Sequence, residues 1–452
     1  MSQSKHLWIF PVSVYIVFSL LLLACFFPEA CCDEFGNVAG MCYDAAHSYA
    51  IEIGGLSPVD NWHSALFMLS GRLIRFFLIT FLNWEVDGYE AVRLMWVLSS
   101  FVLIGNVSVW IYIMSAECKY PKFLFIPFVA AQSVLYRFCQ LDLSFFFVAL
   151  LSVLITVLHL SFIIKRKLLY CIIIIGLFLL SVIMVDLRRN SLLLVPCLAY
   201  LIIPLEGTWR KCIVSITLAF GVYLGGMMMV KMMPGVEQRF PLTPMIESEL
   251  RIAHLLRGEG GSLRKKLEQV GYKDSGHSYL NSLTAYCAGD WERGRNIDTE
   301  KVRELYIQEI IRHPLHMATA KVLLIVQFYT GGGTPSLVRK MVGRFFPSVN
   351  ENADAWKPLT ERHIVLWFSR LVILVWVGCI GFKLSNNIKK YRLGKSLLSI
   401  AVMVVVYSVS FVVVTPTADT RYLTPSLFFA IPLIWVWYCG GEKHDNVPIS
   451  PR

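Results

Sequence analysis

The feature that most constrains this chain is a series of apolar runs, each about long enough to cross a lipid bilayer. A transmembrane helix needs roughly 20 consecutive, mostly apolar residues, and its backbone must satisfy its own hydrogen bonds in lipid. Ten such runs are found at residues 8–28, 64–83, 91–115, 142–164, 168–187, 191–206, 212–233, 363–383, 396–415 and 423–440. The sequence therefore predicts an all-α, polytopic transmembrane protein with about ten spans.

The composition agrees with this class. Of the 452 residues, 56% are hydrophobic and only 16% are charged, whereas soluble domains carry roughly 25% charged residues. The net charge of +11 is best explained by Lys and Arg that flank cytoplasmic span ends. Because no basic soluble domain is present, we expect a lipid bilayer and no nucleic acid as partner.

The basic clusters predict the orientation of the spans. Residues 165–167, 210–211 and 389–392 are basic and lie in short connections, so we place them in the cytoplasm with both termini. Counting ten spans from there puts the remaining polar segments on the outer face: the first loop and residues 188–190, 234–362 and 416–422.

Two further apolar runs do not fit this count as spans. Residues 123–138 and 315–330 would each begin and end outside, so they are predicted to be re-entrant or interfacial helices. Alternatively, 123–138 is a true span, which would invert part of the scheme.

Three parts of the chain are expected: an N-terminal transmembrane module (1–233), an outer segment (234–362) and C-terminal helices with a short cytoplasmic tail (363–452). Within the outer segment, residues 234–315 contain twelve acidic and twelve basic residues. An apolar pattern through Val302 and Ile311 predicts an amphipathic helix there. We expect a small subdomain on the outer face.

The first loop, between Glu29 and His63, is acidic in an otherwise apolar chain. Its carboxylates include Asp33, Glu34, Asp44, Glu52 and Asp60. Such groups must face water, and above a membrane pocket one of them could take a proton from a substrate as general base. Most of them can equally be solvated loop residues.

Other polar residues lie at predicted outer ends of spans. They are Asp60 with His63, Arg137 with Asp142, Arg188 with Arg189, and Arg421 with Tyr422. Arg offers a bidentate fork for a phosphate at headgroup depth, so these groups predict a shared substrate cavity. Each has a simpler interpretation: the Arg188 pair as interfacial anchors, Asp142 as a helix cap and His63 as an interfacial residue.

At these residues the chain resembles the GT-C superfamily of glycosyltransferases that use polyprenyl-phosphate sugars, such as the protein O-mannosyltransferases and aminoarabinose transferases. The similar segments are Tyr43–Ala46, Asp60–Leu66, Arg137–Asp142, Arg188–Pro196 and Arg421–Tyr422. At Ser64 and Ala65 the chain departs from the prolines usual in the family.

The resemblance implies an inverting enzyme with Asp44 as the catalytic carboxylate, and with Asp33 and Glu34 as the second choice. Family members bind a divalent cation or none, so the resemblance leaves metal dependence open. The expected enzyme lies in the bacterial inner membrane with its site facing outward, and its acceptor is a glycan, a lipid or a protein. The alternatives are a surface polysaccharide polymerase or ligase that uses lipid diphosphates, and a polytopic lipid or sugar transporter.

Overall fold

The computed structural model describes ten continuous segments of the chain. They are residues 64–115, 125–139, 143–164, 166–232, 243–259, 299–330, 334–349, 361–386, 394–413 and 423–440, with short pieces between 13 and 60, between 236 and 292, and at 388. These residues are almost entirely helical. The helices are α3 (Ala65–Leu82), α4 (Gly88–Ser115), α5 (Phe125–Cys139), α6 (Leu143–Ile163), α7 (Lys167–Leu187), η2 (Arg189–Leu193), α8 (Leu194–Ile202), α9 (Thr208–Met232), α10 (Thr243–Leu256), α12 (Thr299–Arg312), α13 (Pro314–Thr330), α14 (Ser336–Phe345), η5 (Pro347–Val349), α15 (Glu361–Asn386), α16 (Gly394–Val413) and α17 (Thr424–Gly440).

Seven of the described helices are long and apolar enough to cross a membrane, namely α3, α4, α6, α7, α9, α15 and α16. They coincide with seven of the ten predicted runs, and they make this an integral membrane protein. The runs at 191–206 and 423–440 also form apolar helices, but these are shorter (Arg189–Ile202 and Thr424–Tyr438). The run at 8–28 lies largely outside the described residues.

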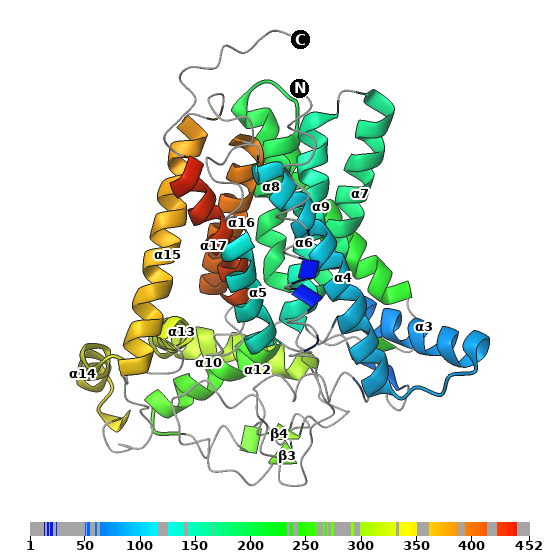
Figure 1. The fold of residues 1–452 in the computed structure, drawn as a ribbon. Coiled ribbons are helices and arrows are strands. Elements are labelled where there is room, and N and C mark those ends of the chain that lie inside the picture. Colours follow the sequence, from blue (N-terminus) through cyan, green and yellow to red (C-terminus); the bar gives the residue numbers. More distant parts are fainter. Residues whose placement is uncertain are drawn as a thin grey trace.

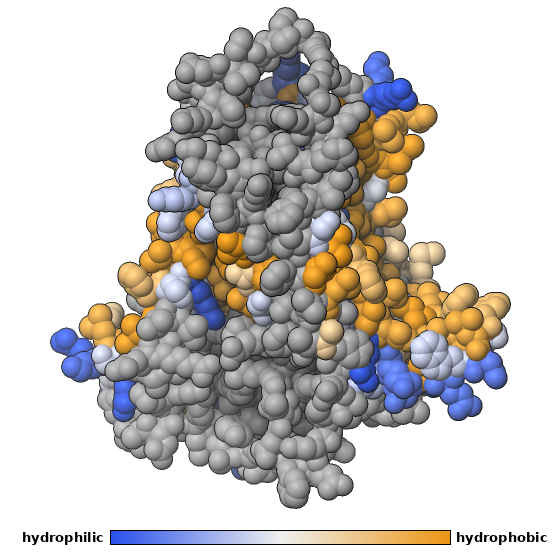
Figure 2. All heavy atoms as spheres, viewed as in Figure 1, coloured by the Kyte–Doolittle hydropathy of each residue, from blue (hydrophilic) through white to orange (hydrophobic). Residues whose placement is uncertain are grey.

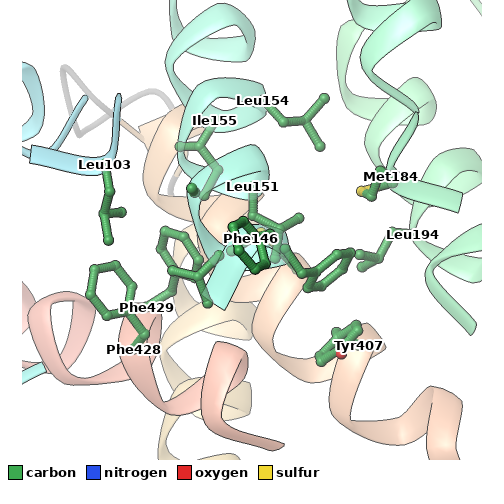
Figure 3. Close-up of a cluster of buried hydrophobic side chains, with 14 of the residues drawn as sticks. Leu103, Phe146, Leu151, Leu154, Ile155, Met184, Leu194, Tyr407, Phe428 and Phe429 are labelled. Atoms are coloured by element: carbon green, nitrogen blue, oxygen red, sulfur yellow. The ribbon is translucent and has the colours of Figure 1, made fainter. Parts of the chain in front are cut away.

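Helices α6 and α16 form the centre of the bundle. In the most apolar stretches of α6 and α16, 61% and 67% of the residues are buried, compared with 22% in each of α3, α9 and α15. Phe146 and Leu151 of α6 lie in a close-packed cluster with Tyr407 of α16 and Phe428 of α17 (Figure 3). The peripheral helices therefore present most of their apolar surface to lipid.

Ring contacts give the relative direction of α4 and α6. Trp96 stacks on Phe145 with ring centroids 5.4 Å apart, and fourteen residues further along each helix Trp110 lies 5.8 Å from His159. Both contacts advance together along the two chains, so α4 and α6 run in the same direction. The predicted scheme, in which the runs at 91–115 and 142–164 cross in opposite directions, is therefore wrong.

The chain between two parallel helices must return to the other end of the bundle, and α5 is the described part of that return. This arrangement favours the alternative in which the run at 123–138 crosses the membrane. Helix α3, in contrast, lies crosswise to α7 and α15 at the end of the bundle where α4 begins (Figure 1). The length and composition of α3 would allow it to span a membrane, but the helix lies crosswise to the spanning helices.

The same end of the bundle is covered by helices that also run crosswise to the spans: α10, α12, α13 and α14, called here the end layer (Figure 1). The predicted helix is present as α12, whose Val302 is buried, but Ile311 of the predicted apolar face is 74% exposed and Glu309 is buried instead. The 315–330 run forms α13, which lies beside the lower end of α15 and crosswise to it (Figure 1). Two short strand pairs complete this region, Val59–Asp60 with Val236–Glu237 and Lys273–Asp274 with Trp291–Glu292.

Candidate functional site

A polar cluster forms where α7 ends, at the end of the bundle that faces the end layer. Helix α7 stops at Leu187, and the chain continues through the 3-10 helix η2. The hydroxyl of Ser191 donates to the carbonyl oxygens of Met184, at 3.0 Å, and Arg188, at 2.6 Å. These bonds satisfy carbonyls that the end of a helix leaves without partners, and they fix the corner that carries Arg188, Arg189 and Asn190.

Arg188 extends from this corner to the start of α6. Its Nη2 donates to the hydroxyl of the buried Ser144 at 2.7 Å. Ser144 is the second residue of α6, so the Arg188 guanidinium lies beside the N-terminal end of this helix. The predicted site residue Asp142 directly precedes α6 in the sequence. The partly exposed Arg188 side chain is thus directed along the end of the bundle rather than outward like a simple interfacial anchor.

Asp186 is a buried member of this polar cluster that the sequence prediction did not single out. Its side chain is 1% exposed, and its Oδ2 accepts from the Ser64 hydroxyl at 2.5 Å and from the Leu66 amide at 3.1 Å. Ser64 is the N-cap of α3, and a helix N-terminus favours an anion. A lone acidic residue in the last turn of an apolar span is a recognised signal of function, and that signal could have identified Asp186.

Arg189 lies on the other side of the same carboxylate. Its Nη2 is 3.8 Å from Asp186 Oδ1, and its side chain is 25% exposed. Asp186 therefore accepts hydrogen bonds from the N-terminus of α3 on one side and faces the Arg189 guanidinium on the other. This arrangement leaves Arg189 partly open to solvent while its position is restrained.

Asn190 connects the cluster to α16. Its Nδ2 donates to the Ser410 hydroxyl at 2.7 Å, close to the C-terminal end of α16. The start of α17 lies at the same level, because the hydroxyls of Ser408 and Ser426 are 2.8 Å apart. The connection that contains Arg421 and Tyr422 leaves from these two helix ends.

Most of the other predicted site residues lie outside the described residues. This holds for Asp33, Glu34, Asp44, His63, Asp142, Arg421 and Tyr422. The backbone of Asp60 lies in the first short strand, paired with Glu237, and Arg137 lies in the last turn of α5. For these two residues the side chains are not described. Of the predicted groups, the structure therefore places the side chains of Arg188 and Arg189.

A second charged cluster holds the end layer together. Glu309 of α12 is buried and receives hydrogen bonds from Arg257 at 2.6 Å and from Lys266 at 3.0 Å. Burial opposes ionisation of Glu309, but these two cations prevail and lower its pKa to about 2. Burial, assisted by Arg257, lowers the pKa of the neighbouring His254 to about 4, so this imidazole is neutral at physiological pH.

Glu249 of α10 makes a third set of contacts, and these reach the bundle. Its carboxylate accepts from the Tyr306 hydroxyl at 2.5 Å and from Lys321 Nζ at 2.8 Å. Burial and this hydrogen bond to Glu249 raise the pKa of Tyr306. Lys321 Nζ also donates to the backbone oxygen of Val413 at 3.0 Å, so the end layer is attached to the last residue of α16, near the polar cluster.

Neither of two apolar surface grooves coincides with the polar cluster. One, of about 550 Å³, lies on α15 around Gly378 and Phe382, and the other, of about 570 Å³, lies between α3 and α4 around Phe77 and Leu98. Their apolar linings and peripheral positions are those of lipid-facing surfaces. In the part of the chain that the structure describes, no group of three or more His, Cys, Asp or Glu side chains is arranged to hold a metal ion.

The polar cluster thus combines two guanidinium groups, a buried carboxylate and several hydroxyls from five segments that are distant in sequence. Such a set can bind an anionic group at the membrane surface. The sequence matches no family model and no curated protein, and no solved structure matches the fold.

Proposed function

We propose that the protein is a membrane glycosyltransferase that moves a sugar from a polyprenyl-phosphate donor to an acceptor at the end of the bundle covered by the end layer. The observation that supports this most directly is the placement of Arg188 and Arg189 at one corner beside the start of α6. A donor whose polyprenyl chain lies along the apolar helices would present its phosphate at this depth.

In the proposed reaction Arg188 and Arg189 bind the donor phosphate, and Asp186 positions Arg189. The acceptor hydroxyl gives its proton to a carboxylate of the first loop, Asp44 in our assignment, with Asp33 or Glu34 as the alternative. The acceptor oxygen attacks the anomeric carbon as the bond from that carbon to the phosphate oxygen breaks. Polyprenyl phosphate leaves, and the anomeric configuration is inverted.

The membrane orientation is part of the proposal. The cationic residues Arg166, Lys167, Arg210 and Lys211 lie at the starts of α7 and α9, opposite to the polar cluster. The positive-inside rule puts that end in the cytoplasm. The polar cluster then faces the extracytoplasmic side, which for a donor of this kind is the outer side of a bacterial inner membrane.

The test is an assay of purified protein in detergent with a polyprenyl-phosphate sugar, scored by release of polyprenyl phosphate. Hydrogen bonds to charged groups contribute about 1.5–3 kcal/mol, so Arg188→Gln and Arg189→Gln are each expected to lower kcat/KM roughly 10- to 100-fold. Arg210→Gln, which removes a cation at the opposite end of the bundle, is the matched control and should retain full activity.

Two results would reject the proposal. One is an unchanged rate in both arginine variants, and the other is a folded wild-type protein that releases no polyprenyl phosphate from any polyprenyl-phosphate sugar. Asp44→Asn separates the transferase from a polymerase or ligase that uses lipid diphosphates. The transferase should lose activity, whereas the other enzyme should retain turnover of its lipid-diphosphate substrate.

A further inference from the structure

Helix α14 carries an apolar stripe on its exposed side. Leu337, Met341 and Phe345 are 68%, 55% and 71% exposed, and their spacing of four residues aligns them along one face of the helix. Val342 and Gly343, on the other side, are buried against the protein. The stripe is therefore not covered by the fold, although it belongs to a helix that is packed on its opposite side.

The same helix carries three exposed cations, Arg339, Lys340 and Arg344, and no acidic residue. Lys340 and Arg344 are four residues apart, so they form a row directly beside the apolar stripe. None of the three cations has an ion pair with an acidic side chain among the residues that the structure describes. A partner with negative charge next to an apolar layer would satisfy both features.

The protein holds α14 at the level where the spans end. The Phe346 ring lies 4.9 Å from that of His316 in α13, and the Ser348 hydroxyl donates to the Leu256 carbonyl oxygen at 2.6 Å. Figure 1 shows α14 beside the lower end of α15, crosswise to it. At that place in Figure 2 orange apolar residues lie towards the apolar band of the bundle, with blue hydrophilic residues on the far side.

We propose that α14 is an interfacial helix that binds anionic phospholipid headgroups of the adjacent leaflet. Leu337, Met341 and Phe345 enter the boundary between headgroups and acyl chains, and Lys340 and Arg344 bind the lipid phosphates. Helix α14 lies beside the lower end of α15 (Figure 1), and the first turns of α15 carry the exposed apolar residues Ile364 and Phe368. This neighbouring apolar surface, together with cations that have no acidic partner among the described residues, favours a lipid surface over an acidic protein. The inference does not depend on the proposed sugar transfer.

The experiment compares full-length wild type with the double variant Lys340→Gln/Arg344→Gln. Phosphatidylglycerol is titrated into each protein in neutral detergent, and bound lipids are counted by native mass spectrometry. A basic residue near an anionic membrane surface contributes about fivefold in affinity, so the double variant should bind phosphatidylglycerol roughly 25-fold more weakly. Binding of phosphatidylcholine should not change.

The matched control is Lys301→Gln/Arg312→Gln, which removes two exposed cations from α12 in the same end layer and should bind phosphatidylglycerol as the wild type does. Thermal unfolding in phosphatidylcholine nanodiscs checks that both variants are folded. In nanodiscs of equal parts phosphatidylcholine and phosphatidylglycerol, only the α14 variant should lack the rise in Tm that bound anionic lipid produces.

Equal phosphatidylglycerol affinity in wild type and the α14 variant would overturn the proposal. So would an equal loss in the α12 control, because the effect would then follow net charge alone. If the α14 variant binds lipid normally but loses an acidic protein that copurifies with the wild type, α14 is a protein-docking helix instead.

Discussion

Asp186 occupies an environment that its place in the sequence does not reveal. In the sequence it is the second-to-last residue of an apolar run, next to two arginines that attract attention first. In the structure it is almost completely buried and accepts hydrogen bonds from Ser64 and Leu66 at the start of α3. Its structural task is therefore to fix α3 to the end of α7, and in the proposed reaction it also restrains Arg189.

Replacement of Asp186 by alanine would leave the Ser64 hydroxyl and the Leu66 amide without this acceptor. A buried polar group that loses its partner costs about 1–3 kcal/mol, so Asp186→Ala should lower the free energy of unfolding by about that amount, measured by denaturation in detergent. Asp186→Asn retains an oxygen acceptor and should lose less. Glu85→Ala, at an exposed position, serves as control. A wild-type unfolding midpoint for Asp186→Ala would contradict this account.

His254 should make the stability of the protein sensitive to acid. Its pKa is lowered from 6.5 to about 4 in the folded state, so below pH 6.5 the unfolded state takes up a proton that the folded state does not. The free energy of unfolding should therefore fall between about pH 6.5 and 4, by about 1–3 kcal/mol from this group.

The measurement is the unfolding midpoint as a function of pH for wild type and His254→Gln. The variant should lose less stability across this window than the wild type does. Glu309 adds a further loss of stability as pH falls from 4.5 towards about 2, and the variant should retain this loss. Parallel pH curves for wild type and His254→Gln would show that the imidazole is not responsible.

At the scale of elements, the start of α4 depends on a close backbone approach. A Cβ built on Gly88 would lie 1.6 Å from the backbone oxygen of Ala50, which is far inside van der Waals contact. Glycine at this position therefore allows the segment around residues 50–54 to pack against α4. The sequence itself gives no sign of this contact, because the two segments are separated by α3.

Gly88→Ala should accordingly destabilise the protein, since backbone rather than a flexible side chain must move. Overpacking typically costs 1–3 kcal/mol, and we expect a lower Tm in detergent by a corresponding amount. Gly105→Ala is the matched control on the same helix, because nothing lies within 4 Å of its added Cβ. Alanine at 105 favours the helix, so that variant should be at least as stable as the wild type. Equal Tm values for the two variants would rule out the close contact.

At the scale of the whole molecule, the parallel directions of α4 and α6 place two loops on opposite sides of the membrane. The connection between α3 and α4, at Glu85, lies at the end of the bundle that carries the polar cluster. The connection between α8 and α9, at Glu206, lies at the opposite end of the bundle.

With the orientation proposed above, an epitope inserted after Glu85 should be labelled by antibody in cells whose outer face is accessible, and one inserted after Glu206 only after permeabilisation. The predicted scheme with α3 as a span also puts Glu206 inside, but it puts Glu85 inside as well. Labelling of Glu85 decides between the two arrangements, and protection of both sites in intact cells would restore the original scheme.

Local pattern was sufficient to predict most of the helices. Among the described residues, apolar runs near the thickness of a bilayer predicted helices at nine expected spans, the tenth (8–28) lying largely outside them, and the repeat through Val302 and Ile311 predicted α12. The Arg188 pair was also found this way, because arginine at the end of an apolar run is unusual enough to stand out. The direction in which each helix runs was harder to predict. Counting spans assigns each helix a direction from the previous one, so counting the crosswise α3 as a span gave α4 the direction opposite to α6 and left α5 out of the count.

The sequence by itself determined that the chain is a membrane-embedded helical protein, because apolar length and the scarcity of charge follow from the solvent that lipid provides. Only the tertiary structure decided that α3 lies crosswise, that α4 runs parallel to α6, and that Asp186 accepts a hydrogen bond from Ser64. The physical reason is that these features depend on contacts between residues far apart in the sequence, 49 positions for Trp96 with Phe145 and 122 for Ser64 with Asp186. A helix of suitable length and polarity can either cross a bilayer or lie at its surface, and its packing partners select between the two.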